Sequence, residues 1–480
     1  MKQIKFLILV IMISTSILAQ NYNDALRLSF PGYLNGTRSL GMGNATTSFY
    51  TGYSSVLVNP ALIGKANVIE YSGGLNFNNL SNSTRFLRNE ESNSNTSTAI
   101  SEVGFVFPLP TARGSMVLGF GYSKYNDFNY SSNFRGFNSG KSYIEYLTDG
   151  NDDLAFLLGL SYPVFDQSNN YIKDTTRISG RLTQEGKIEQ KGDLNAWSLA
   201  GSMEIAPNLF IGATFNYLSG ELERTFDYYE DDFDNVYPSG FLLDPNDDRT
   251  ENFQSFYLKN ILDWDISGWD LRLGLLYETR QNFRFGFQVK LPSYYFVKEN
   301  FFTDAESKFG NDVEFFLDEP YRSKIEYDIK TPFELSGGIS YTYSLFTVSA
   351  DLKYIDYTQT EFTSGFNPFE MDNLNSEMKD LFTQVVNVNF GGEFYVPNLN
   401  TTFRAGFMMM PSAYKNDPGE YDKKFITLGA GINATGPFTL ELAYAFGWWK
   451  DFGDVYGSNF ARYYDDINVH NFMISGRYRF

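Results

Sequence analysis

The sequence predicts an all-β protein, a transmembrane antiparallel β-barrel of about fourteen strands with an N-terminal hatch, or plug, inside the lumen. Three observations predict it: a last strand, residues 471–480, in which apolar residues such as Phe472 and Phe480 alternate with polar ones; an aromatic content of 18%; and connectors of alternating length. A strand with one apolar and one polar face suits lipid on one side and a wet lumen on the other. Closure into a barrel then pairs every backbone group.

Residues 1–20 have the pattern of a secretory signal peptide. Lys2 and Lys5 precede an apolar run, residues 6–13, and a small residue, Ala19, follows it. A single membrane anchor is the alternative, but it needs about 20 apolar residues, and this run is shorter. We therefore expect the mature chain to begin near Gln20. After the signal, no run is long and apolar enough for a spanning helix, which excludes a helical inner-membrane transporter.

The composition favours one large domain over several small ones. The 480 residues contain no linker, no low-complexity tract and no change in composition, so we expect residues 67–480 to form the barrel. The 46 Phe and 34 Tyr fit the aromatic girdles of a membrane barrel, with a secreted array of β-sandwiches as the alternative. The chain has no Cys, which excludes thiol chemistry, and its net charge of −19 makes nucleic acid a poor partner.

The barrel strands are predicted by two-residue alternation. Residues 283–291, 346–354 and 438–446 are clear examples, with charged residues on the polar face that would line the lumen. Short turns are expected near residues 108–113, 206–208, 279–282, 342–345, 397–401 and 433–437. Long polar loops are expected near residues 80–98, 131–188, 226–262, 297–327, 358–382, 410–422 and 448–466. Short periplasmic turns and long outer loops are typical of membrane barrels. Six short and seven long connectors imply about fourteen strands.

Residues 21–66 do not alternate and precede the first strand. The segment is rich in glycine, and irregular structure of this kind is tolerated inside a lumen. A disordered periplasmic tail is the alternative. The apolar residues of the segment, such as Leu26, Phe30 and Leu57, need burial, so we expect a hatch.

Two motifs in this segment, Thr37–Ala45 (TRSLGMGNA) and Asn59–Ile63 (NPALI), resemble the N-terminal hatch of the FadL/TodX family. Members of that family are outer-membrane transporters of long-chain fatty acids and other hydrophobic compounds. Weaker strand matches follow in the same order over nearly the whole mature chain. The resemblance implies a fourteen-stranded barrel with a hatch in the bacterial outer membrane, and passive uptake of a hydrophobic ligand that is gated by the hatch.

The resemblance also implies site residues. Asn59, Pro60 and Ala61 match the hatch motif and are expected to gate or anchor the hatch, with a simple Asn-Pro turn as the equal alternative. The hatch fold would be held by Arg38, Gly41 and Gly43. Four cations expected in the lumen are candidates for binding a ligand carboxylate, unless acidic residues of the lumen neutralise them: Arg272, Arg284, Lys290 and Arg404.

Binding of protein cargo is the alternative function. FadL-like barrels include PorV, a component of type IX secretion, and the long acidic loops here would suit a protein partner. Five acidic residues between positions 226 and 262 are also candidate Ca²⁺ ligands, although a solvated loop is the simpler interpretation. They are Asp231, Asp232, Asp234, Asp247 and Asp248.

Gly119 and Gly121 are expected places for a bend in the third strand.

We expect no enzyme, because barrel hydrolases depend on His and the single His470 precedes the last strand without a catalytic motif. No catalytic residue, metal site or cofactor is therefore predicted. The expected partners are outer-membrane lipid and a hydrophobic small molecule, with a protein partner left open. The barrel is expected to act as a monomer.

Overall fold

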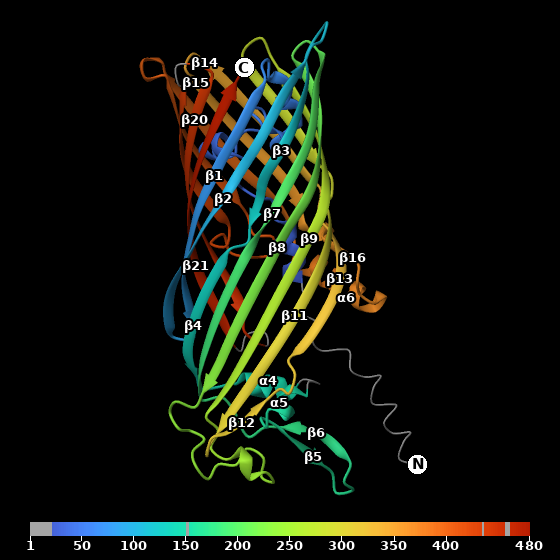
Figure 1. The fold of residues 1–480 in the computed structure, drawn as a ribbon, viewed down its shortest axis with the longest axis vertical. Coiled ribbons are helices and arrows are strands. Elements are labelled where there is room, and N and C mark those ends of the chain that lie inside the picture. Colours follow the sequence, from blue (N-terminus) through green and yellow to red (C-terminus); the bar gives the residue numbers. More distant parts are fainter. Residues whose placement is uncertain (1–21, 150–152, 434–435, 457–460) are drawn as a thin grey trace.

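The chain folds into a closed antiparallel barrel of 14 strands, in which β21 pairs with β1 to close the wall (Figure 1). The structure is a computed structural model and describes residues 22–149, 153–433, 436–456 and 461–480. The predicted signal peptide, residues 1–20, lies outside this part. Among the described residues, no helix is both long and apolar enough to span a membrane.

The strands of the wall are β1 (Glu70–Phe86), β2 (Asn89–Leu109), β3 (Met116–Asp127), β4 (Tyr130–Asn138), β7 (Leu182–Ala206), β8 (Leu209–Asp231), β9 (Ser255–Glu278), β10 (Phe283–Lys290), β11 (Tyr294–Phe309), β13 (Tyr321–Lys330), β14 (Glu334–Tyr343), β15 (Phe346–Asp356), β16 (Glu361–Ser364), β17 (Gln384–Val396), β18 (Thr401–Met410), β19 (Lys423–Asn433), β20 (Phe438–Asp454) and β21 (Arg462–Arg479). Four wall strands are interrupted and consist of two pieces each: β3 with β4, β10 with β11, β13 with β14, and β15 with β16. Three short strands extend the outer loops: β5 (Tyr162–Phe165), β6 (Tyr171–Thr175) and β12 (Val313–Phe316).

The helices lie inside the barrel, in its outer loops or, in the case of η4, in a short turn at the opposite end. Those inside are α1 (Tyr22–Ser29), α2 (Thr37–Gly41), α3 (Ser55–Val58) and the 3-10 helix η1 (Pro60–Lys65). Those outside are α4 (Tyr143–Asp149), α5 (Leu154–Leu157), α6 (Pro368–Leu381) and the 3-10 helices η2 (Asp248–Thr250), η3 (Tyr357–Gln359) and η4 (Pro397–Leu399). We call residues 22–66 the hatch segment. It lies within the barrel, as the sequence predicted (Figure 1).

Five of the six predicted short turns are present, at the end of the barrel where the last strand stops. The sixth, residues 433–437, connects β19 to β20 and includes residues 434–435, which lie outside the described part of the chain. The first predicted loop, residues 80–98, is wrong. There β1 and β2 continue as a paired ladder up to Phe86 and Asn89, so the connection is a tight turn. The other long connectors are shorter than predicted for a related reason, since strands such as β8 and β9 run on beyond the membrane.

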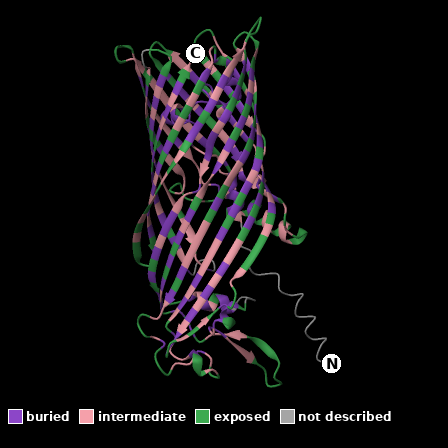
Figure 2. Cartoon of the chain, in the orientation of Figure 1, coloured by how far each residue is buried: buried purple, intermediate pink, exposed green. Residues whose placement is uncertain are grey.

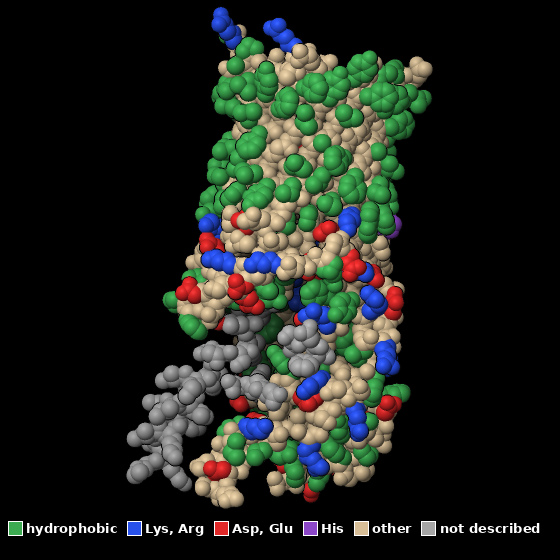
Figure 3. Space-filling view, turned by 180° about the vertical axis from the view of Figure 1, so that it is seen from behind, with side chains coloured by type: hydrophobic (Ala, Val, Ile, Leu, Met, Phe, Trp, Pro, Cys, Tyr) green, Lys and Arg blue, Asp and Glu red, His purple; other side chains and the backbone are tan. Residues whose placement is uncertain are grey.

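Strand β9 indicates the position of the membrane. Its apolar side chains face outward in one half of the strand and inward in the other half. In its inner half the apolar side chains, such as Leu273 and Leu275, are exposed on the outer surface, while Arg272 faces the lumen. In its outer half Leu262 and Ile266 face inward and Asp263 faces outward. The stripes of burial follow the strands (Figure 2), and apolar side chains form a band over the half with the short turns (Figure 3). This band faces lipid, which places the barrel in the bacterial outer membrane.

The wall has very different heights on its two sides. Strands β7, β8 and β9 have 25, 23 and 24 residues, whereas β18 and β19 have 10 and 11. At about 3.3 Å per residue the short strands only just span a bilayer. The long strands continue outward as a tall half-wall (Figure 1). Helix α6 lies beside β16, on the outside of the barrel (Figure 1).

The outer end of the tall half-wall has its own apolar core. Residues from α4, α5 and the loops pack there against wall residues such as Phe134 and Phe256. Glu230 is buried beneath them and accepts hydrogen bonds from Ser142, the Tyr143 backbone, Gln184 and Tyr228. Its burial raises the pKa of the Glu230 carboxyl. This cap covers the outer end of the lumen with folded protein.

Candidate functional site

The hatch segment is attached to the barrel wall through the Asn59-Pro60-Ala61 motif. Asn59 is fully buried, and its side-chain nitrogen donates to the carbonyl of Thr47 at 2.7 Å and to that of Leu275 at 3.1 Å. Its side-chain oxygen accepts from the backbone of Ala61 at 3.1 Å, while Pro60 occupies the first turn of η1. The motif therefore forms a helix cap and also bonds the hatch segment to β9.

Glycines allow the hatch segment and the wall to approach closely. A side chain on Gly43, which has a φ of +60°, would collide with the backbone of Phe390 and Phe407. Gly41 lies directly against Gly429 of β19. The wall contributes its own glycines, at each of which a Cβ atom would collide with the hatch segment: Gly104, Gly212, Gly274, Gly286, Gly391 and Gly406. Backbone thus packs on backbone around much of the lumen, an arrangement that only glycine permits.

An ion-pair network fixes the same part of the hatch segment. Arg38 donates to both carboxylate oxygens of Glu393 at 3.1 Å. Arg404 bridges Glu393, at 3.1 Å, and Glu441, at 2.6 Å. Arg477 continues the network to Glu441 at 3.5 Å. The network thus links α2 to strands β17, β18, β20 and β21.

The structure places the four predicted ligand-binding cations in the lumen, and three of them are neutralised by acidic residues. Arg272 pairs with Asp270 at 3.3 Å and also donates to the carbonyl of Leu57 in the hatch segment. Lys290 pairs with Glu334 at 2.9 Å, and Arg404 belongs to the network above. Arg284 instead donates to the hydroxyls of Ser340 and Thr342 and lies over the ring of Phe49. These cations stabilise the barrel and the hatch segment.

A small polar cavity of about 50 Å³ lies among these groups. It is bounded by residues 31–35 of the hatch segment and by wall residues that include Arg272, Glu334 and Asp351. This volume holds one or two water molecules and no hydrocarbon chain.

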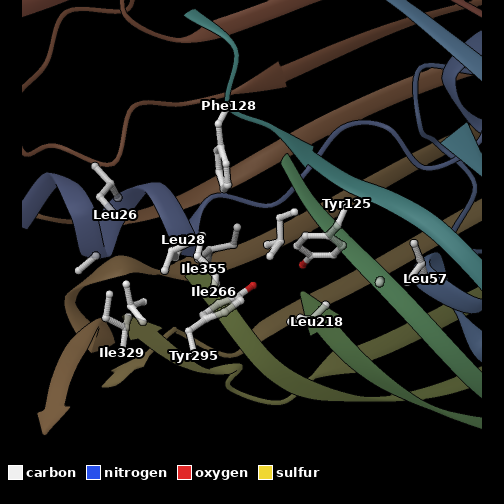
Figure 4. Packing of buried hydrophobic residues seen from close by; sticks show 14 of the residues in the cluster. Leu26, Leu28, Leu57, Tyr125, Phe128, Leu218, Ile266, Tyr295, Ile329 and Ile355 are labelled. Carbon is white, nitrogen blue, oxygen red and sulfur yellow. The ribbon is translucent and has the colours of Figure 1, made fainter. Parts of the chain in front are cut away.

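Further out, the inward faces of β8, β9, β11, β13 and β15 carry aliphatic and aromatic side chains that pack together with α1 (Figure 4). We call the space enclosed by these faces, which α1 occupies, the apolar chamber. Its wall is formed mainly by Leu218, Leu222, Leu262, Ile266, Tyr295, Val297, Ile329 and Ile355. Helix α1 fills it with Ala25, Leu26 and Leu28, all of which are buried. Tyr22 at the start of α1 contacts the rings of Phe382 and Tyr414 at the rim. The sequence analysis did not predict this chamber. The signal for it is present in residues 262–266, where Leu262 and Ile266 lie on the face that is polar in the membrane-spanning part of the same strand.

One other expectation is corrected by the structure. The sequence predicts a bend of the third strand at Gly119 or Gly121. In the structure the strand is instead interrupted between β3 and β4, after a register shift at Lys124 to Asn126. Gly121 has a different role, because its lack of a side chain leaves room for the ring of Tyr53. In the described part of the chain no group of three metal-ligating side chains occurs. Asp232 accepts from the backbone of Val236 and Tyr237, and Asp247 pairs with Arg249, so both have structural roles.

His470 lies on the outer surface, where its Nδ1 is 2.7 Å from the hydroxyl of Tyr444. This position, next to the rings of Phe446 and Tyr444, is that of an interfacial aromatic cluster.

The closed wall, the lipid-facing band and the folded segment in the lumen together define a bacterial outer-membrane β-barrel with an internal N-terminal hatch. No protein-family model and no curated protein matches the chain. Solved structures do match. The toluene transporter TodX of P. putida is 15% identical, with a TM-score of 0.56, over 94% of this chain and 99% of that chain.

A FadL homologue of Pseudomonas aeruginosa is 12% identical, with a TM-score of 0.56, over 92% of this chain and 98% of that chain. The Ralstonia pickettii toluene transporter TbuX is 14% identical, with a TM-score of 0.53, over 93% and 98%. The fold of this chain is therefore that of the FadL/TodX barrels.

Proposed function

We propose that this barrel takes up hydrophobic small molecules, of the long-chain fatty acid or hydrocarbon type, passively across the outer membrane, and that the hatch segment gates their passage. The observation that carries the proposal is the apolar chamber. The lumen of a membrane barrel is ordinarily polar, so a continuous aliphatic lining has a cost unless an apolar body occupies it. Here that body is α1, and a ligand of similar character would take its place.

The named structural neighbours support the same function. Their descriptions are of toluene transporters and a FadL homologue, which are transporters or channels rather than enzymes. Binding of protein cargo, the alternative from the sequence, is not favoured by them. A single barrel contains the chamber and the hatch segment, so a monomer suffices for the proposed uptake. We retain Asn59, Pro60 and Ala61 as anchors around which the gate moves.

The gate can be tested with a disulfide, because the chain has no cysteine of its own. The hydroxyls of Ser29, at the end of α1, and Thr360, at the rim, lie 3.2 Å apart. In the double variant Ser29→Cys/Thr360→Cys, oxidation would hold α1 in the chamber. We expect uptake of radiolabelled palmitate and hexadecane by cells to fall at least about tenfold on oxidation and to return on reduction.

The matched control is Asn79→Cys/Thr96→Cys, a pair of register partners on an exposed face of the wall that joins β1 to β2, with side-chain atoms 2.9 Å apart. Its oxidation is expected to leave uptake unchanged. Uptake at the normal rate with α1 held in the chamber would overturn hatch gating. Uptake of neither compound by cells with the unmodified protein would overturn the transport function itself.

A further inference from the structure

A groove of about 550 Å³ lies where β1, β20, β21 and the loop before β19 meet. Among the described residues its lining consists of three cations, two carboxylates, two tyrosines and a leucine, which are Arg85, Lys450, Arg462, Glu420, Asp451, Tyr421, Tyr464 and Leu87. Arg85 is the register partner of Tyr464, which shares a face of β21 with the exposed Phe472. The groove therefore opens on the outer surface of the barrel and not into the lumen.

Strand β21 gives the height of this groove relative to the membrane. His470 belongs to the interfacial aromatic cluster. Asp466, the register partner of Lys450, is four residues further out on β21, and Tyr464 is six. At about 3.3 Å per residue and a strand tilt of about 40°, the groove lies roughly 10–15 Å beyond the aromatic cluster. Lipid head groups occupy this height, where a belt of charged side chains follows the apolar band (Figure 3).

The cations of the groove are held in place by neighbouring groups. Lys450 donates to Glu420 twice, from its Nζ atom at 2.8 Å and from its backbone nitrogen at 2.9 Å, so the loop before β19 is fixed against β20. Arg462 donates to Asp454 at 2.8 Å and lies over the ring of Phe452. Lysine has three donor hydrogens and arginine five, so these partners leave donors of both side chains for a ligand.

The lining combines two kinds of recognition. Three cations face two carboxylates, a local excess of positive charge in a chain whose net charge is −19. Cations bind phosphate through charge-assisted hydrogen bonds. The rings of Tyr421 and Tyr464 offer flat, partly apolar faces of the kind that stack on sugar rings, and carboxylates accept hydrogen bonds from sugar hydroxyls. A phosphorylated sugar uses all of these groups, whereas a glycerophospholipid offers the phosphate alone.

We propose that this groove binds the phosphorylated sugar head group of lipopolysaccharide, the glycolipid of the outer leaflet. Arg85, Lys450 and Arg462 bind the phosphate, and the two tyrosines contact the sugar, while the acyl chains lie against the apolar band. A lipid bound here bridges β1 and β21, the two strands that close the wall. It is a partner of the barrel and not its substrate, so the inference does not depend on the proposed uptake.

The test measures lipid binding by the full chain in detergent with native mass spectrometry. Diphosphoryl lipid A carries the phosphorylated sugar head group, and dipalmitoyl phosphatidylglycerol carries a phosphate without the sugar. Both lipids are titrated into the unmodified protein and into Arg85→Gln/Lys450→Gln/Arg462→Gln. The single variant Lys450→Gln serves if the triple variant does not fold.

The matched control removes the same number of charges from exposed cations on the tall half-wall, in the variant Arg135→Gln/Lys187→Gln/Lys298→Gln. A further arm adds excess inorganic phosphate to the complex with lipid A. It distinguishes a site for the lipid head group from a site for free phosphate.

We expect the unmodified protein to bind one lipid A at least about tenfold more tightly than phosphatidylglycerol. The triple variant should weaken lipid A binding about tenfold or more, Lys450→Gln about threefold, and the control less than about twofold. Inorganic phosphate should leave lipid A bound. Equal loss in the control, no loss in either groove variant, no preference for lipid A, or displacement by inorganic phosphate would each overturn the inference.

Discussion

The two ends of the hatch segment are held in the lumen by different forces. The outer end, Tyr22 to Phe30, is held mostly by apolar contacts, with Leu26 and Leu28 buried in the chamber. The inner part, residues 38–65, is held by the ion pairs of Arg38, the bonds of Asn59 and the close approach of glycines on both sides.

For the proposed gating, this difference identifies the part of the hatch segment that we expect to move. Apolar contacts are not directional, and a ligand of the same character can replace them at little cost. Buried ion pairs and close-packed backbone have no such replacement, because separating them leaves unpaired charges and voids. In the proposed uptake, residues 38–65 of the hatch segment would therefore act as a fixed base and Tyr22 to Phe30 as a removable arm, and the arm occupies the place proposed for the ligand.

The largest loss of barrel stability is expected from breaking the ion-pair network of the base. Glu393→Ala removes the partner of Arg38 and one partner of Arg404, both of which lie in the lumen. Removing one member of a buried ion pair costs about 3–5 kcal/mol, because the other charge stays buried without compensation. We expect a clearly lower temperature of barrel unfolding, measured by the heat-dependent shift in gel mobility.

The control for Glu393→Ala is an exposed ion pair. Asp466 lies 4.0 Å from Arg85, and both side chains are largely exposed. Asp466→Ala is expected to cost less than about 1 kcal/mol. If Glu393→Ala unfolds at the same temperature as Asp466→Ala, the network does not hold the base.

The sequence predicted the barrel because lipid requires strict alternation, and its prediction was weakest where lipid ends. Residues 80–86 and 89–98 are rich in Asn, Ser and Thr, and the sequence predicts a loop there because they lack an apolar face. In the structure they are the paired outer parts of β1 and β2, which need no lipid-facing side. Hydrophobic patterning cannot reveal a strand whose two faces are both polar.

A smaller loss of stability is expected from adding a methyl group where the base of the hatch segment meets the barrel wall. In Gly274→Ala the new Cβ would collide with the side-chain oxygen of Asn59 and lie 2.9 Å from Pro60. Overpacking of this kind costs about 1–3 kcal/mol. We expect faster proteolysis within residues 38–65, measured by limited digestion and mass spectrometry of the fragments.

Gly337→Ala is the matched control for this change. Gly337 lies on β14, and a Cβ atom there would have no neighbour within 4 Å. Unchanged digestion in Gly337→Ala together with faster digestion in Gly274→Ala would support close packing as the reason. Equal digestion of the two variants would contradict it.

The candidate site was only partly accessible from the sequence. Asn59-Pro60-Ala61 was singled out because it matches the hatch motif of the family that the sequence resembles, and its capping bond is local; its role in gating stays a prediction. The pairing of Lys290 with Glu334 joins residues 44 positions apart, and such partners depend on barrel register. For the same reason Arg284, which donates to the hydroxyls of Ser340 and Thr342 and not to a carboxylate, could not be distinguished from the ion-paired cations before the fold was known.

The smallest effect on overall stability is expected from weakening the arm. Leu28→Ala removes buried methyl groups from α1, which ordinarily costs about 2–5 kcal/mol in a closed core. Here the cost falls on the docking of α1, because the base and the wall do not depend on it. We expect faster hydrogen exchange of residues 22–30 with an unchanged temperature of unfolding, and tighter binding of dodecanol, since the arm competes less with the ligand. Leu399→Ala, the same change at an exposed position in η4, should alter none of these. If Leu28→Ala lowers the unfolding temperature as much as Glu393→Ala does, the arm is part of the base, and the ligand cannot enter by displacing α1 alone.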